Sequence, residues 1–280
     1  MAGVLTGLSN LGLEHLENKD IFALEDEKDS TAEAAWEETV NETEFIYDKK
    51  MSCPVCGKSF ITKVMKSGKA KLLSTDLDLR PVYEGIDANK YSVCQCTYCG
   101  YTALPNGFEQ VTELQKKNIK QQICDSVLLT PYIDSIYSYE DAIERYKLAL
   151  ACAVVKKSKN SEKAYICIRF AWLYRGYCEY LKRCGKKEEA SEARKAELLY
   201  IQNAYKGFVT ARSTEDYPMC GMDSSTVDYL IAAIAVQLKK YDVAEKLLSS
   251  LLTASDVNKR TKDKARELKD IIKTNKAQGK

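Results

Sequence analysis

The sequence predicts a mainly α-helical protein with a small β unit. Between residues 51 and 105, short β-prone runs such as 60–65 and 71–74 are broken by glycine and proline, which is typical of a loop-rich β unit. From about residue 112 to 274, glycine and proline are scarce, and Ala, Leu, Tyr, Lys and Glu recur every three or four residues, as packed helices require. We therefore expect an acidic leader over residues 1–50, the β unit over 51–105 and a helical domain over 106–280.

The leader is set apart by its charge. Residues 1–50 contain 13 acidic and 4 basic residues, a net charge of −9, so the other 230 residues carry +11 of the chain's net charge of +2. The first twenty residues have no Lys or Arg before Lys19, whereas a signal peptide starts with basic residues. Eleven cysteines in a chain without an export signal favour a reducing compartment, so we expect a cytoplasmic protein.

Two segments of the β unit share a metal-binding pattern. Residues 53–57 read CPVCG and residues 96–100 read CTYCG, each with two cysteines three positions apart and a glycine directly after them. Such a turn points both sulfurs the same way, and the glycine can adopt the left-handed conformation that aims backbone N–H groups at the thiolates. Two such turns form a tetrahedral cage, so we predict a zinc-ribbon-like site whose metal ligands are Cys53, Cys56, Cys96 and Cys99.

This site leaves some alternatives open. Iron also binds four thiolates, although zinc is the commoner structural ion. Cys94 lies two residues before Cys96 and could replace it, but only Cys96 and Cys99 repeat the spacing of the first turn. The 39 residues between Cys56 and Cys96 exceed the roughly 15–20 of a compact zinc site, so they must form a hairpin-like insert. The other six cysteines lie in or between helices, where packing is their default role.

Within the helical domain, the spacing of apolar residues resembles tetratricopeptide units. Tyr139, Ala142, Tyr146 and Ala149 occupy the aromatic, small, aromatic and small positions of a second repeat helix. Tyr241, Ala244, Leu248 and Leu251 repeat this spacing, and a degenerate middle unit precedes Gly185. We expect a tetratricopeptide-like helical array in which each hairpin buries its apolar stripe on its neighbour, with a generic helical bundle as the alternative.

The residue content argues against familiar catalytic sites. His15 is the chain's single histidine and lies far from any motif, so no Ser-His-Asp or Cys-His arrangement and no HExxH site can be assembled without it. A metal held by four thiolates has no open position at which to activate water. We therefore expect that the protein is not an enzyme.

Two kinds of partner remain. The preferred hypothesis is a metal-stabilised adaptor or scaffold that binds a protein or peptide through the helical array. The alternative is a nucleic-acid-associated protein, because the β unit carries seven basic residues and four tyrosines, and residues 256–280 contain nine basic and four acidic residues. No apolar run approaches the roughly 20 residues of a membrane span, so we expect no membrane partner.

Long stretches of the chain resemble the bacterial family known as domain of unknown function 2225. The segments that carry the resemblance are LSNLGLEHLENKDIF, CPVCGKSFITKVMKSGK, YEGIDANKYSVCQCTYCGY, YKLALACAVVKKSKNSEKAYICIRFAWLYR and GMDSSTVDYLIAAIAVQLKKYDVAEKLL. The resemblance implies a cytosolic bacterial protein with a zinc-ribbon-like segment followed by tetratricopeptide-like helices, and it implies no established activity. In the family pattern the second cysteine pair is a plain CxxCG, which fits Cys96 and Cys99 and makes Cys94 a local departure.

Overall fold

The computed structural model describes residues 41–129 and 135–278, which belong to one compact unit that starts at Asn41. Most of the predicted acidic leader, including His15, lies outside the described residues. The described part of the chain is mainly helical, with short antiparallel strand pairs, which confirms the predicted fold class. The first strand begins at Ile46, so regular structure starts before residue 51, where the β unit was predicted to begin.

The β unit consists of three antiparallel pairs of strands within the described residues. In the first pair, Ser52 lies opposite Ser59, and in the third pair Gln95 lies opposite Thr102. Short 3-10 helices cover Glu42–Phe45 and Ala88–Tyr91. The pairs are β1 (Ile46–Ser52) with β2 (Ser59–Met65), β3 (Leu72–Thr75) with β4 (Pro81–Tyr83), and β5 (Cys94–Gln95) with β6 (Thr102–Ala103).

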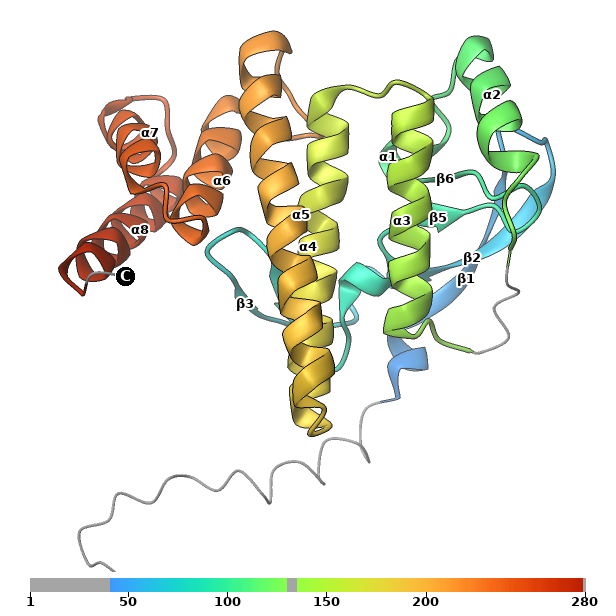
Figure 1. Ribbon diagram of the computed structural model, residues 1–280, viewed down its shortest axis with the longest axis horizontal. Helices are drawn as coiled ribbons and strands as arrows, with labels where there is room; N and C mark the ends of the chain where they lie inside the picture. The colour runs from blue at the N-terminus through green and yellow to red at the C-terminus, as the bar shows by residue number, and fades with distance from the viewer. Residues whose placement is uncertain (1–40, 130–134, 279–280) are drawn as a thin grey trace, which may run out of the picture. The chain divides into compact units, whose positions relative to one another are not determined.

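The helices follow the β unit in the chain. Figure 1 shows α3, α4 and α5 side by side, with β1, β2, β5 and β6 on the side of α3, β3 on the opposite side toward α6, and α6, α7 and α8 beyond α5. The helices are α1 (Pro105–Phe108), α2 (Glu113–Ile119), the π-helical turn η5 (Lys120–Cys124), α3 (Tyr139–Val155), α4 (Asn160–Arg183), α5 (Lys187–Thr214), α6 (Ser224–Gln237), α7 (Tyr241–Thr253) and α8 (Lys259–Ala277).

Local sequence explains where several helices begin. Ser138 accepts a hydrogen bond from the backbone N–H of Asp141, whose carboxylate accepts one from the N–H of Ser138, so α3 starts with a capping box. Asp223 and Asn258 cap α6 and α8 in the simpler way, through their side-chain oxygens. These caps satisfy backbone donors that have no partner in the first helical turn.

Small residues let the two longest helices approach closely. A Cβ atom added to Gly207 of α5 would lie 2.8 Å from the Cβ of Ala164 in α4, a separation that real Cβ atoms do not tolerate. The predicted contact positions Ala142, Tyr146 and Ala149 are buried against α4, and Ala244 and Leu248 are buried between α6 and α8. The helices therefore pack as hairpins along their apolar stripes, and their likeness to tetratricopeptide units stays a prediction.

The insert between the two cysteine pairs docks on the helices through a buried ion network. Arg175 of α4 makes salt bridges to Asp76 and Asp78 from the β3–β4 turn, at 2.8 and 2.5 Å, and to Glu197 of α5 at 2.8 Å. Asp78 and Glu197 are 0% exposed. Burial by itself would raise the pKa of Asp78, but hydrogen bonds from Arg175 lower it below its ordinary value. The network therefore keeps Asp78 charged at neutral pH, and its contribution to stability is lost only as acid protonates that carboxylate.

Replacing Arg175 should destabilise the fold severely. Arg175→Met leaves the buried Asp78 carboxylate without a cation and leaves Glu197 with Arg194 alone, and losing one partner of a buried ion pair costs about 3–5 kcal/mol. The free energy of unfolding from urea titration measures this cost. Arg266→Met, which breaks an exposed ion pair with Asp263 on α8, is the matched control and should change stability little. Equal effects of the two variants would contradict a structural role for the network.

Candidate metal centre

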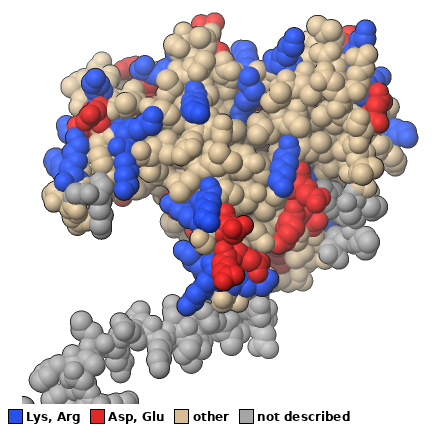
Figure 2. All heavy atoms as spheres, in the orientation of Figure 1, with Lys and Arg blue, Asp and Glu red and all other residues tan. Residues whose placement is uncertain are grey.

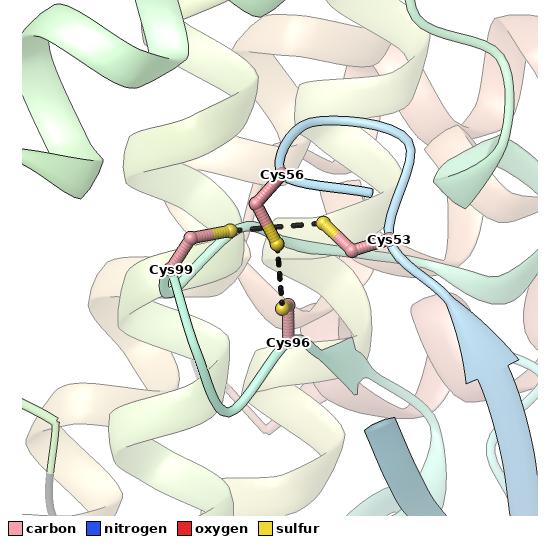
Figure 3. A group of neighbouring side chains, drawn as sticks. All are labelled: Cys53, Cys56, Cys96 and Cys99. Carbon is pink, nitrogen blue, oxygen red and sulfur yellow. Dashed lines mark hydrogen bonds between the residues drawn. The ribbon is translucent and has the colours of Figure 1, made fainter. Parts of the chain in front are cut away.

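Four cysteine sulfurs meet at one end of the β unit (Figure 3). The Sγ atoms of Cys53, Cys56, Cys96 and Cys99 all lie within 4.8 Å of one another. The Sγ atoms of Cys53 and Cys99 are 3.6 Å apart, and those of Cys56 and Cys96 are 3.7 Å apart. The structure thus brings together the four cysteines that the sequence analysis selected, and together they could hold a metal ion.

Each cysteine pair forms the tip of a β-hairpin, and the two tips share one hydrogen-bonding pattern. The backbone N–H of Cys53 donates to the carbonyl of Lys58, and the N–H of Cys96 donates to the carbonyl of Tyr101. The N–H of Gly57 donates a hydrogen bond to the carbonyl of Cys53 at 2.9 Å, and the N–H of Gly100 donates one to the carbonyl of Cys96 at 3.0 Å. The same five-residue pattern therefore folds in the same way twice.

The two glycines are required for different reasons. Both have φ near +75°, a conformation that side chains with a Cβ rarely adopt. A Cβ on Gly57 would meet nothing within 4 Å, so only the backbone conformation demands glycine there. A Cβ on Gly100 would lie 2.7 Å from Cγ1 of Val127, so this position also needs the space for the chain that follows η5.

Hydrogen bonds among the sulfurs shift the thiol pKa values of Cys53, Cys96 and Cys99 in opposite directions. Hydrogen bonds from Cys53 and Cys99 lower the pKa of the Cys96 thiol to about 2, with backbone N–H groups of Tyr98 and Cys99 adding to this effect. Hydrogen bonding to Cys96 raises the pKa of Cys53 to about 12, and hydrogen bonding to Cys53 and then to Cys96 raises the pKa of Cys99. Four thiolates this close cannot coexist without a compensating cation, because like charges in a buried site repel strongly.

The spacing of the sulfurs fits a tetrahedral metal. A Zn–S bond of about 2.3 Å in a regular tetrahedron places the sulfur atoms about 3.8 Å apart. The two shortest sulfur–sulfur separations, 3.6 and 3.7 Å, are close to that edge length. An ion held in this way would be bound by thiolates alone, as in closed structural sites.

The cysteine cluster lies within a hydrophobic core that includes helical residues. Tyr101 and Phe108 pack with ring centroids 4.9 Å apart, and the Tyr101 hydroxyl donates to the Phe108 carbonyl at 3.0 Å. Ile119 of α2, Ile123 of η5 and Cys152 of α3 belong to the same buried cluster. The centre is therefore joined by packing to the first three helices, and the predicted boundary at residues 105–106 crosses this core.

The remaining cysteines near the centre differ in their positions. Cys94 is buried in β5 opposite Ala103 and does not belong to the group of four sulfurs. Cys124, which the sequence analysis assigned to packing, lies beside the group. Burial raises the pKa of its thiol, and a hydrogen bond with Cys99 partly offsets that rise. The spacing of cysteines in the sequence did not predict that Cys124 lies beside Cys99, because the turn η5 and the packing of α2 on α3 bring it to that position.

None of the helices in the described part of the chain combines the length and the apolar character needed to span a membrane.

Comparison with known proteins identifies a family and no characterised relative. The family described as "Uncharacterized protein conserved in bacteria (DUF2225)" matches residues 46–272, which include the four cysteines and most of the helices. Neither the curated proteins nor the solved structures contain a match to the chain.

Purified protein should contain about one metal ion per chain, because a closed site of four thiolates holds one ion. Replacing Cys53 or Cys96 by Ser removes one ligand of the set and should abolish that content, measured by elemental analysis of the gel-filtered protein. Cys94→Ser is the matched control and should retain the ion. Metal retained in both ligand variants, or lost in the control, would show that the site is assigned wrongly.

Chelation should loosen the β unit and leave the distant helices folded. The metal would link the β1–β2 tip to the β5–β6 tip, and binding free energy in small metal sites contributes directly to folding. The core that joins α4, α5 and α6 contains none of the four cysteines. Hydrogen exchange followed by mass spectrometry should therefore show lost protection in β1, β2, β5 and β6 and retained protection in α4–α8. A loss of protection throughout the chain would refute this separation.

Proposed function

We propose that this chain, which belongs to the DUF2225 family of uncharacterised proteins conserved in bacteria, is a non-catalytic scaffold that binds a protein partner through its helical array. One structural zinc ion, held by Cys53, Cys56, Cys96 and Cys99, stabilises it, with iron as the alternative ion. The free cysteines suit the reducing cytoplasm, which is the proposed location.

The closed set of four sulfurs is the observation that carries the structural part of this proposal. All four positions of a tetrahedral ion would be filled by protein, so no site would remain for substrate or water. The surroundings are apolar, with Val55, Phe60 and Tyr101 buried around the sulfurs. Residues 41–129 and 135–278 also contain no histidine that could serve as a general base there.

A cluster of tyrosines on the helical array supports partner binding. Tyr139, where α3 begins, stacks on Tyr177 of α4 with ring centroids 5.1 Å apart and contacts Tyr180 at 5.5 Å. The Tyr177 hydroxyl donates to Glu140 at 2.6 Å, which holds the ring in place. Tyr180 is 42% exposed at the edge of the cluster. Preorganised aromatic side chains that keep an accessible edge are the groups most often found at the centre of protein interfaces.

The nucleic-acid alternative has less support from the side chains that suggested it. Lys63, Arg80 and Lys90 of the β unit are paired with carboxylates, so their charge is already compensated. Tyr91 and Tyr101 are buried and cannot stack on bases. Among the β unit's tyrosines, Tyr47 and Tyr98 are exposed, and the Tyr98 ring lies under the Lys58 ammonium.

The distribution of charge on the helices also gives little support to nucleic-acid binding. Arg266, Lys273 and Lys276 of the basic helix α8 pair with carboxylates on α7 or on α8 itself. On the face shown in Figure 2, the Lys and Arg side chains are scattered, in places beside Asp and Glu, and do not form a continuous stripe. Phosphate backbones are normally bound by such a stripe.

Affinity capture from the native cell tests the proposed function. The tagged full chain should retain a protein partner after nuclease treatment, and Tyr180→Ser should reduce the retained amount at least several-fold, as expected for an aromatic interface anchor. Tyr217→Ser, at a tyrosine that is 38% exposed near the end of α5, is the matched control and should retain the partner.

The nucleic-acid alternative predicts different outcomes in the same experiment. Capture that disappears with nuclease, or that falls steeply as salt concentration rises, would favour phosphate-driven binding over a protein interface.

A further inference from the structure

A second recessed site lies away from the cysteines, where α6, α8 and the β3–β4 turn meet. It is a cavity of about 250 Å³. Its polar lining consists of two cations from α8, one tyrosine from α6 and three threonines from separate elements: Arg260, Lys264, Tyr229, Thr75, Thr226 and Thr261. None of the described residues that line it carries a carboxylate.

The two cations share this cavity, and neither forms a salt bridge with a carboxylate of the described residues. The salt bridges of α8 use Arg266, Lys273 and Lys276 instead. Arg260 and Lys264 lie four residues apart on one face of the helix, and like charges at that spacing destabilise a helix. Burial and the neighbouring Arg260 lower the pKa of Lys264, so the pair carries an electrostatic cost that an anion would relieve.

Hydroxyl donors complete the lining. The backbone N–H groups of Thr226 and Thr261 are already bound by the helix caps Asp223 and Asn258, and Thr226 also gives its hydroxyl to Asp223. Thr75 and Thr261 therefore remain as hydroxyl donors beside the two cations. A guanidinium, an ammonium and two hydroxyls suit a tetrahedral oxyanion that carries more than one negative charge.

A larger cavity of about 540 Å³ adjoins this one and shares Thr75, Tyr229 and Lys264 with it. Its wall contains apolar side chains of α6, Arg194 and the amide of Gln237, which donates to Asp78 and accepts from Arg175. The carboxylates of Asp76 and Asp78 also face this space, but both pair with Arg175. Glu267 lines it one turn from Lys264 and favours the charged ammonium. The larger cavity thus has room for an uncharged, polar organic group.

From these features we infer that the two cavities form a binding site for a small phosphorylated molecule. Arg260, Lys264, Thr75 and Thr261 bind its phosphate group, and the larger cavity beside Gln237 takes the rest of the molecule. The site is independent of the metal centre and of the proposed protein partner, since its lining contains neither the cysteines nor the tyrosine cluster.

Titration calorimetry on the full chain tests this site with three probes: inorganic phosphate, glucose 6-phosphate and glucose. Both phosphates should bind in the millimolar range or tighter, and glucose 6-phosphate should bind more tightly than inorganic phosphate because it also fills the larger cavity. Glucose alone should bind far more weakly than its phosphate. Lys264→Gln and Arg260→Gln should each weaken phosphate binding about tenfold, because each removes a charge-assisted contact.

The control is Lys273→Gln, an exposed cation on α8 that lines neither cavity, and it should leave both affinities unchanged. Circular dichroism of each variant verifies folding. Absence of phosphate binding would overturn the site. An equal loss of phosphate affinity in Lys273→Gln would also overturn it, because phosphate would then be attracted by the general positive charge of the surface. Equal affinity for the two phosphates would overturn the role of the larger cavity.

Discussion

The crowding of four cysteine sulfurs is the constraint on which the β unit depends. Sulfurs within 4.8 Å of one another cannot all be ionised unless a cation sits among them, and they cannot be placed there unless both hairpin tips turn toward the same point. The repeated hydrogen bonds of the two tips and the positive φ of Gly57 and Gly100 provide that geometry. Two segments separated by 39 residues of chain are thereby held side by side.

Holding both hairpin tips together also limits the conformations that residues 57–95 can adopt. With its ends anchored at Cys56 and Cys96, the insert folds as a hairpin whose turn reaches the helices, where Arg175 binds Asp76 and Asp78. The cost of burying these charges is offset only because each carboxylate has a cation and further hydrogen bonds. The β unit and the helices are thus joined at two places, the apolar core around Phe108 and the polar network around Arg175.

Whether a cation is paired with a carboxylate decides whether its charge is available to a ligand. Some of the β-unit cations that first suggested nucleic-acid binding, such as Lys63 and Arg80, form salt bridges with carboxylates. Arg260 and Lys264 face a cavity without such partners. A count of basic residues cannot distinguish these two groups, because only the positions of the carboxylates decide which positive charges remain available to a ligand.

The sequence by itself determined the features that depend on neighbouring residues. Two Cys-x-x-Cys-Gly turns predicted which four sulfurs come together, and helical spacing predicted the buried faces of α3 and α7, because backbone geometry repeats over a few residues. Tertiary structure alone decided that Cys124 lies beside Cys99, that Arg175 pairs with Asp76 across 99 residues, and that β3, α6 and α8 together line an open pocket at Lys264. Those contacts depend on the paths of many intervening residues, and no local pattern encodes such a path.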